Sequence, residues 1–118
     1  MRRTKLNSMS PKRRKEMPKY YKLIKKLRGL CENRSEISGN PPDWQSDYLV
    51  EPHHIGGRNG HLLMDPFNII MVTRPEHDAE ETKIKPATLP KIGREKLFEI
   101  IEGIRIRQGF IKENFYRR

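Results

Sequence analysis

All four histidines of this chain lie between positions 53 and 77, and two of them, His53 and His54, are adjacent. Neutral imidazole binds divalent cations and also accepts protons near neutral pH, so a histidine cluster indicates metal binding or acid–base chemistry. Adjacent side chains on an extended segment point in opposite directions. One histidine of the pair can therefore bind a metal while the other acts as a base.

A third histidine, His77, lies at the start of a predicted helix. If a hairpin folds back onto this helix, it brings His77 close to the pair at 53–54. Glu81 follows His77 by four residues and lies on the same helical face, so its carboxylate can bind the same ion. We therefore expect two imidazoles and Glu81 around one divalent ion, at about 2.1 Å per ligand. His61 is expected on a loop surface.

Two short strands and a helix are expected to position these side chains. Residues 48–51 are predicted to form the first strand, and a glycine-containing loop, HIGGRNG, follows it. The run FNIIMV at 67–72 is rich in β-branched and aromatic residues and predicts the second strand. Pro75 suits the first turn of a helix over 74–84, where acidic residues complement the helix dipole.

Amphipathic helices are predicted on both sides of this segment, over 18–30 and 91–108. Each carries apolar side chains at the i, i+3, i+4 spacing of a buried helical face. Trp44, in the turn-rich stretch 33–47, is predicted to anchor that loop by packing. The two apolar stripes are Tyr20, Leu23, Ile24 and Leu27 in the first helix, and Leu97, Ile100, Ile101 and Ile104 in the second.

The positive charge is concentrated at the amino terminus. Residues 1–28 carry twelve Lys and Arg side chains against one acid, Glu16, whereas the remaining 90 residues carry thirteen basic and fourteen acidic side chains. The net charge of +10 therefore comes from one segment attached to a nearly neutral body. This asymmetry is typical of proteins that bind a polyanion, because Lys and Arg neutralise phosphates and release counterions.

We predict residues 1–17 to be a basic flexible arm, in which Ser10 and Pro11 start a short helical turn that Pro18 interrupts. A polyanion is the expected partner. A solvated tail without a partner is one alternative, and an anionic membrane is a weaker one, because the arm lacks the apolar face of an interfacial helix before residue 20. Arg58, in the glycine-containing loop, could hold a phosphate through two parallel hydrogen bonds, or be a solvent-exposed loop charge. The other side chains expected to contact the polyanion are Arg13, Arg14, Lys15, Lys22 and Lys26.

The composition limits the other function classes. Hydrophobic and charged residues each make up 34% of the 118 residues, so one small core is expected. No apolar run is long enough to span a bilayer and no apolar signal core begins the chain, so we expect no membrane partner and a cytoplasmic location. The single cysteine, Cys31, excludes an internal disulfide framework.

Residues 48–82 resemble the HNH endonucleases, also known as His-Me finger or ββα-metal nucleases. In that family a His-His or Asp-His pair is followed by an Asn before or within a second strand, and then by a helical His. The matching segments here are HHIGGR with His53 and His54, DPFNIIMV with Asn68, and RPEHDAEE with His77. The match covers under a third of the chain, and the basic amino terminus is similar in composition to that of small phage-encoded members.

The resemblance implies an α+β fold with a small ββα-metal core at about 48–84, flanked by amino- and carboxyl-terminal helices within a single domain, 18–118. It also implies a DNA endonuclease that leaves 5′-phosphate and 3′-hydroxyl ends. A phage-encoded member would act in the cytoplasm of the host cell. Phage or host protein partners are not identified by any motif.

The resemblance also assigns roles to individual residues. His53 and His77 would bind one divalent ion, and His54 would be the general base that activates water. Asn68 would hold the loop after His54 in place through backbone hydrogen bonds; the alternative is an ordinary residue at a strand edge. Many members carry a third metal-binding histidine where this chain has Glu81, which would suit a harder ion such as Mg or Mn, although Ni and Zn remain candidates.

The chain departs from many phage-encoded relatives at a second, structural metal site. Those relatives bind zinc through two pairs of cysteines, and three of the four thiols are missing here. We therefore expect no structural zinc and a loop held by packing, around Trp44. The corresponding positions are Cys31, Arg34, Thr73 and Glu76.

Two alternatives to a nuclease remain open. The first is a DNA-binding module on the same fold with a degenerate site, which the missing cysteines and Glu81 favour. A pure binder, however, does not need the combination of His53, His54, Asn68 and His77. The second is an RNA-binding protein, which should carry aromatic residues among its basic ones; residues 1–19 contain none.

Overall fold

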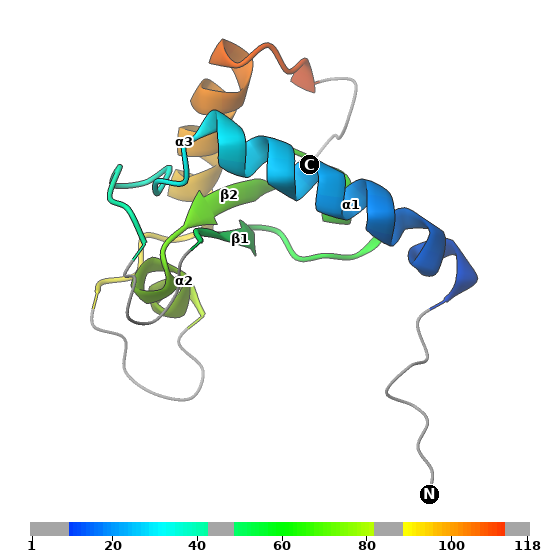
Figure 1. The fold of residues 1–118 in the computed structure, drawn as a ribbon. Coiled ribbons are helices and arrows are strands. Elements are labelled where there is room, and N and C mark those ends of the chain that lie inside the picture. Colours follow the sequence, from blue (N-terminus) through cyan, green and yellow to red (C-terminus); the bar gives the residue numbers. More distant parts are fainter. Residues whose placement is uncertain (1–9, 43–48, 82–88, 113–118) are drawn as a thin grey trace, which may run out of the picture.

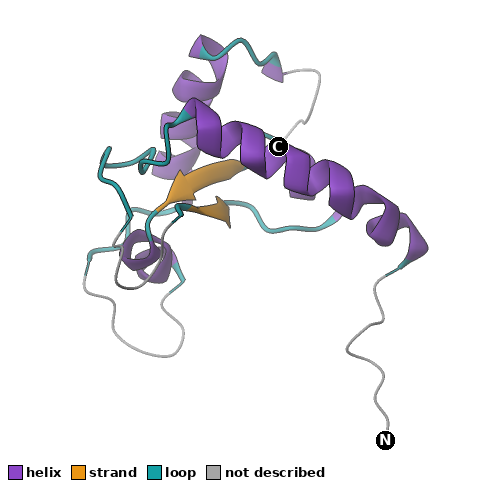
Figure 2. Cartoon of the chain, in the orientation of Figure 1, coloured by secondary structure: helices purple, strands orange, loops and turns teal. Residues whose placement is uncertain are grey.

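The computed structural model describes residues 10–42, 49–81 and 89–112, and its fold is α+β, as the sequence predicts (Figures 1 and 2). Within these ranges no helix is both long and apolar enough to cross a bilayer. In chain order the elements are α1 (Pro11–Leu30), β1 (Glu51–His54), the 3-10 helix η2 (Gly60–Met64), β2 (Ile69–Val72), α2 (Arg74–Glu80) and α3 (Arg94–Arg107).

The register of the β1–β2 hairpin determines which face of the sheet each side chain occupies. The strands are antiparallel, with His53 opposite Ile70 and His54 opposite Ile69. Successive side chains on a strand alternate between faces, and directly paired residues share one. His53 therefore lies on the face of Ile70, and His54 lies on the opposite face with Ile69.

Helices α1 and α3 pack on opposite faces of the hairpin (Figure 1). All four residues of β2 are fully buried, which explains why its sequence is continuously apolar rather than alternating. Most of the predicted apolar stripes are confirmed as core. The cluster under α1 includes Tyr20, Ile24, Leu27, Ile69 and Met71, and the cluster under α3 includes Ile70, Val72, Leu97 and Ile101.

Helix α1 begins where the sequence places an N-cap, because Ser10 Oγ accepts a hydrogen bond from the Arg13 amide at 3.1 Å. The predicted interruption at Pro18 is wrong, since the helix continues through this residue. An internal proline removes one backbone hydrogen bond, yet the helix continues, and the adjacent Met17 packs on the core. Residues 11–17 therefore belong to the helix rather than to a flexible arm.

The predicted bounds of the strands are also wrong by a few residues. β1 is displaced from 48–51 because its register follows the pairing with β2, not the local apolar residues. β2 begins after Asn68, whose side chain accepts a hydrogen bond from the Gly56 amide in the loop after β1. The predicted helix 74–84 ends at Glu80, and residues 82–84 lie outside the described residues.

A buried ion pair, which the sequence did not predict, connects α3 to the loop after α1. Arg105 is fully buried and donates to both oxygens of Glu36, at 2.6 and 2.8 Å. It also donates to the carbonyl oxygens of Pro66 and Ile69, each at 2.9 Å. Glu36 in turn accepts a hydrogen bond from the Met71 amide. This network holds the loop after α1 against β2.

Further polar contacts join the same loop to α2. Ser38 Oγ donates to Glu76 Oε2 at 2.6 Å, and Glu76 Oε1 accepts from the Thr73 amide at 2.9 Å. Burial raises the pKa of Glu76, but hydrogen bonds from Ser35, Ser38 and Thr73 lower it overall. Polar contacts therefore hold this loop in addition to packing; the predicted anchor Trp44 lies outside the described residues.

Candidate metal centre

Strand β1 sends the two adjacent histidines to opposite faces of the hairpin. His53 faces α2, where its ring lies 5.2 Å from that of His77 between centroids. His54 faces α1, where its ring stacks on that of Tyr20. The sequence-based prediction that the pair would not share one ion therefore has a structural basis in the alternation along β1.

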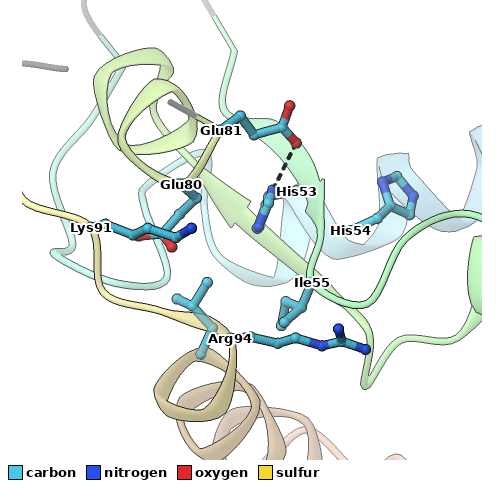
Figure 3. A pocket seen from close by; sticks show the side chains of 8 residues that line it. His53, His54, Ile55, Glu80, Glu81, Lys91 and Arg94 are labelled. Atoms are coloured by element: carbon cyan, nitrogen blue, oxygen red, sulfur yellow. Dashed lines mark ion pairs between the residues drawn. The ribbon is translucent and has the colours of Figure 1, made fainter. Parts of the chain in front are cut away.

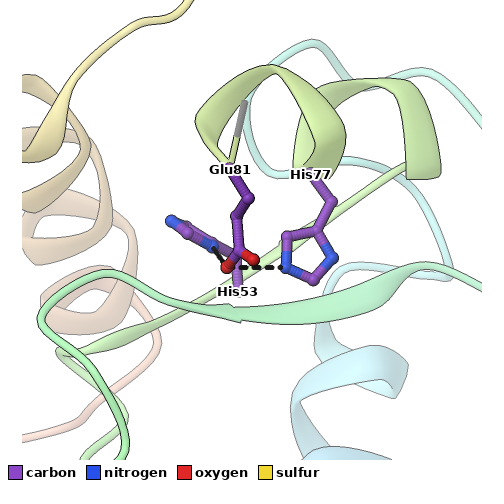
Figure 4. Close-up of side chains that lie close together, drawn as sticks. All are labelled: His53, His77 and Glu81. Atoms are coloured by element: carbon purple, nitrogen blue, oxygen red, sulfur yellow. Dashed lines mark ion pairs between the residues drawn. The ribbon is translucent and has the colours of Figure 1, made fainter. Parts of the chain in front are cut away.

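His53, His77 and Glu81 form a group that could hold a metal ion, and we refer to them as the metal-binding group (Figure 4). One ligand atom from each lies within 4.8 Å of the others. Both His53 Nδ1 and His77 Nε2 are 3.4 Å from the same atom, Glu81 Oε2. Figure 4 shows the carboxylate between the two imidazoles.

These separations also match those expected between ligands of one shared ion. Two ligand atoms about 2.1 Å from one tetrahedrally coordinated ion are themselves about 3.4 Å apart. His53 Nδ1 is buried and has no hydrogen-bond partner among the described residues. A buried polar atom without a partner is costly, and an ion bound between these side chains would supply the missing partner.

Burial also keeps the His53 imidazole in its neutral form. The pKa of His53 is lowered, first because burial disfavours the charged ring and then because of repulsion from His77. The carboxylates of Glu81 and Glu80 partly oppose this shift. Only the neutral form of imidazole offers a lone pair to a metal, so the environment of His53 favours metal binding.

A carboxylate that the sequence analysis did not identify orients the other imidazole. Glu51 Oε1 lies 2.7 Å from His77 Nδ1, and Glu51 Oε2 pairs with Arg74 Nε at 3.1 Å. A carboxylate can only accept, so His77 Nδ1 carries a proton, and Nε2 is the nitrogen that would offer a lone pair to a bound ion. Carboxylate–histidine pairs of this kind fix the tautomer of many metal-binding histidines.

His54 is held by a residue of α1. The hydroxyl of Tyr20 lies 3.2 Å from His54 Nε2, and the ring centroids are 5.8 Å apart. Burial, followed by repulsion from Arg58 and His53, lowers the pKa of His54 from 6.5 to about 4. His54 is therefore neutral at physiological pH and able to accept a proton.

The predicted phosphate-binding residue Arg58 lies near His54. Its guanidinium carbon is 5.8 Å above the ring of Tyr20, and its backbone carbonyl accepts a hydrogen bond from Arg13 at 3.1 Å. The amino-terminal half of α1 therefore contacts the loop that follows His54. Arg13, predicted to contact DNA, has a structural role in this contact.

Asn68 is fully buried and bridges the loop that follows His54. Its Oδ1 accepts from the Gly56 amide at 2.7 Å, and its Nδ2 donates to the carbonyls of Gly57 and Leu62. A Cβ at Gly56 would lie 3.0 Å from Oδ1, so a larger residue here would require Asn68 to shift by a few tenths of an ångström. The Asn68 side chain thus links the loop after His54 to the start of β2, and Asn68 itself directly precedes that strand.

The other basic residues predicted to bind DNA lie on α1 but differ in their surroundings. Arg14, Lys15 and Lys22 are exposed. Lys26 is exposed as well, and its Nζ lies 5.1 Å from the centre of the Phe110 ring. These side chains therefore form an exposed basic surface along α1.

A pocket of about 270 Å³ adjoins the metal-binding group and is lined in part by His53, His54 and Glu81 (Figure 3). Two basic residues that the sequence analysis missed, Lys91 and Arg94, also line it. They come from the start of α3 and the segment before it, far from the histidines in sequence. No spacing rule connects them to His53, so the sequence carried no signal for them.

The chain was compared with protein-family models, with curated proteins and with solved structures. No family model matches it, and neither of the other two comparisons gives a significant match.

Proposed function

We propose that this protein is a metal-dependent endonuclease of the HNH type that hydrolyses phosphodiester bonds in DNA. In this proposal β1, β2 and α2 are the ββα-metal core. The observation that carries the proposal is the approach of His53 Nδ1 and His77 Nε2 to one oxygen of Glu81, at 3.4 Å each, beside the neutral imidazole of His54.

The ion would be held by His53, His77 and Glu81. When bound, a divalent ion stabilises negative charge that develops on a phosphate and on the departing oxygen. His54, which burial keeps neutral, would take the proton from the attacking water; its pKa of about 4 makes it a weaker base than an ordinary imidazole. Asn68 would keep the loop after His54 in place through its three hydrogen bonds.

The charge distribution supports DNA as the substrate. The seven exposed basic side chains of α1 lie on the helix that also carries Tyr20, the partner of His54. DNA bound along α1 would therefore pass close to the candidate site. The exposed basic residues of α1 are Lys12, Arg14, Lys15, Lys19, Lys22, Lys25 and Lys26.

One observation favours the rival, a DNA-binding module without catalysis. Nε2 of His54 is already engaged by the hydroxyl of Tyr20, so this nitrogen is not open to water in the described conformation. Against the rival, a pure binder needs neither the convergence of His53, His77 and Glu81 nor the Glu51–His77 pair. The two functions differ in whether the phosphodiester bond breaks.

Cleavage of supercoiled plasmid in the presence of Mn²⁺ or Mg²⁺ tests the proposal. We expect nicked or linear product from the wild type, and a loss of rate by roughly 10²- to 10⁴-fold in His54→Ala. His54→Ala should still bind the metal, whereas His77→Ala should lose both metal binding and cleavage. Wild-type protein that binds plasmid but never cuts it, with any of these ions, would leave the binding module as the function.

A further inference from the structure

Lys91 and Arg94 form no ion pair with a carboxylate in the described part of the chain. Elsewhere Arg74 pairs with Glu51, Arg105 with Glu36, Lys96 with Glu99 and Lys112 with Glu102. Cations that line a pocket without an acidic partner are available to bind an anion.

The exposed guanidinium of Arg94 lies near the Phe98 ring and the backbone of Gly56. Its Cζ lies 5.9 Å from the centre of the Phe98 ring, one turn further along α3. Its Nη2 would be 3.3 Å from a Cβ at Gly56, so the guanidinium lies beside the backbone two residues after His54. Packing of this kind lowers the entropy that the side chain would lose on binding a ligand.

The carboxylates of the pocket are already used. Glu80 accepts hydrogen bonds from the amides of Ile92 at 2.7 Å and Gly93 at 3.1 Å, which ties α2 to the segment before α3. Glu81 belongs to the metal-binding group. The two cations of the pocket balance these two carboxylates, so a bound divalent ion would leave the pocket with a net positive charge.

We infer that Lys91 and Arg94 bind a phosphate of the nucleic-acid backbone on the α3 side of the pocket, next to the phosphate that the metal-binding group engages. Arg94 supplies a planar fork for two phosphate oxygens, and Lys91 supplies a point charge. This inference rests on the proposed function for the identity of the polyanion. It adds α3 to α1 as a second surface that contacts the substrate.

Binding of a short fluorescein-labelled DNA duplex tests the inference. Anisotropy titrations would be made over a range of KCl concentrations with Mn²⁺ present. They would compare the double variant Lys91→Ala/Arg94→Ala with the control Lys96→Ala. Both would also carry His54→Ala, which prevents cutting. Lys96 is a matched control, because it is exposed on α3 and pairs only weakly, at 3.7 Å, with Glu99. Mn²⁺ affinity and thermal melting of each variant would be measured in parallel.

We expect each of the two substitutions in the double variant to weaken duplex binding by about tenfold, because each removes one phosphate-binding side chain. The slope of log affinity against log salt should fall by roughly one to two units. Lys96→Ala should match its parent, and all variants should bind Mn²⁺ equally. Replacing Mn²⁺ with EDTA should weaken duplex binding by both the double variant and the control, because each pocket then loses two positive charges.

Equal DNA affinity and salt dependence in the double variant and in Lys96→Ala would overturn the inference and leave the metal centre untouched. If instead the double variant weakens binding as expected but the wild type never cleaves DNA, the anion pocket stands and the proposed hydrolysis falls. Weak Mn²⁺ binding by the double variant would also overturn the inference, because the two cations would then act on the metal rather than on DNA.

Discussion

Glu51 and His77 meet through a 2.7 Å contact between Oε1 and Nδ1, although 26 positions separate them in the chain. Glu51 lies two residues before His53 on β1 and therefore on the same face of the hairpin. One strand thus supplies both a metal-binding imidazole and the carboxylate that orients the second imidazole. The remaining oxygen of Glu51 is held by Arg74.

Replacing Glu51 with Gln should weaken metal binding. The amide keeps the shape of the side chain but loses the charge that fixes the tautomer of His77. We expect the affinity for Mn²⁺ or Zn²⁺, measured by calorimetry, to fall by about 10- to 100-fold. Glu99→Gln, which changes an exposed carboxylate on α3, is the control and should leave the affinity unchanged. Equal affinities of the two variants would refute the orienting role.

Tyr20→Phe removes the hydroxyl that contacts His54 and keeps the ring stack. Because the hydroxyl occupies the nitrogen that would take a proton from water, its removal should speed plasmid cleavage by about 2- to 10-fold, the value of one hydrogen bond. DNA affinity should not change. A slower variant would contradict this account and would show that the hydroxyl orients His54 for catalysis.

Truncating Arg105 to Ala should strongly destabilise the fold. The change leaves the carboxylate of Glu36, whose side chain is only 2% exposed, buried without its partner. We expect a decrease of about 3–5 kcal/mol in the free energy of unfolding, measured by urea titration. Lys112→Ala breaks an exposed pair with Glu102 and should cost less than about 1 kcal/mol. Similar decreases in both variants would contradict the structural role of Arg105.

The metal-free protein should lose stability as the pH falls. The folded-state pKa values of His53 and His54 are lowered, to about 4 for His54, so the unfolded chain binds more protons between about pH 6.5 and pH 4. Stability is therefore fully present above that window and is lost on acidification through it. In EDTA, urea midpoints should decrease from pH 7 to pH 5.

The controls for this pH dependence are two single substitutions. His54→Asn should flatten the fall in the urea midpoint, because it removes one group that takes up a proton on unfolding. His61→Asn, a change at an exposed position of η2, should leave the fall as it is. A midpoint that is constant or rises towards pH 5 would show that these imidazoles are not held neutral in the folded protein.

The part of the site that follows from local spacing could be predicted from the sequence. His77 and Glu81 share a helical face because they are four residues apart, and His53 and His54 diverge because strands alternate. The α+β class and most of the apolar stripes followed from periodicity for the same reason. Glu51 could also have been found, since it lies two residues before His53 in the same strand.

The rest depends on packing between distant segments, which no local pattern encodes. Tyr20 appeared in the sequence only as part of an apolar stripe, and its hydroxyl meets His54 because α1 crosses the hairpin there. Pro18 was predicted to end a helix that tertiary packing instead preserves. Arg105 continues the i+4 spacing of the buried face of α3. A charged residue is not expected to be buried unless it has a partner, and the spacing does not show that Glu36 is that partner.

The central claim, a metal ion held by β1 and the end of α2, is tested most directly by anomalous diffraction from crystals soaked in MnCl₂. We predict a single strong peak about 2.1 Å from His53 Nδ1, His77 Nε2 and a Glu81 oxygen. A peak elsewhere in the molecule, or none when the crystals are saturated with the ion, would contradict the account.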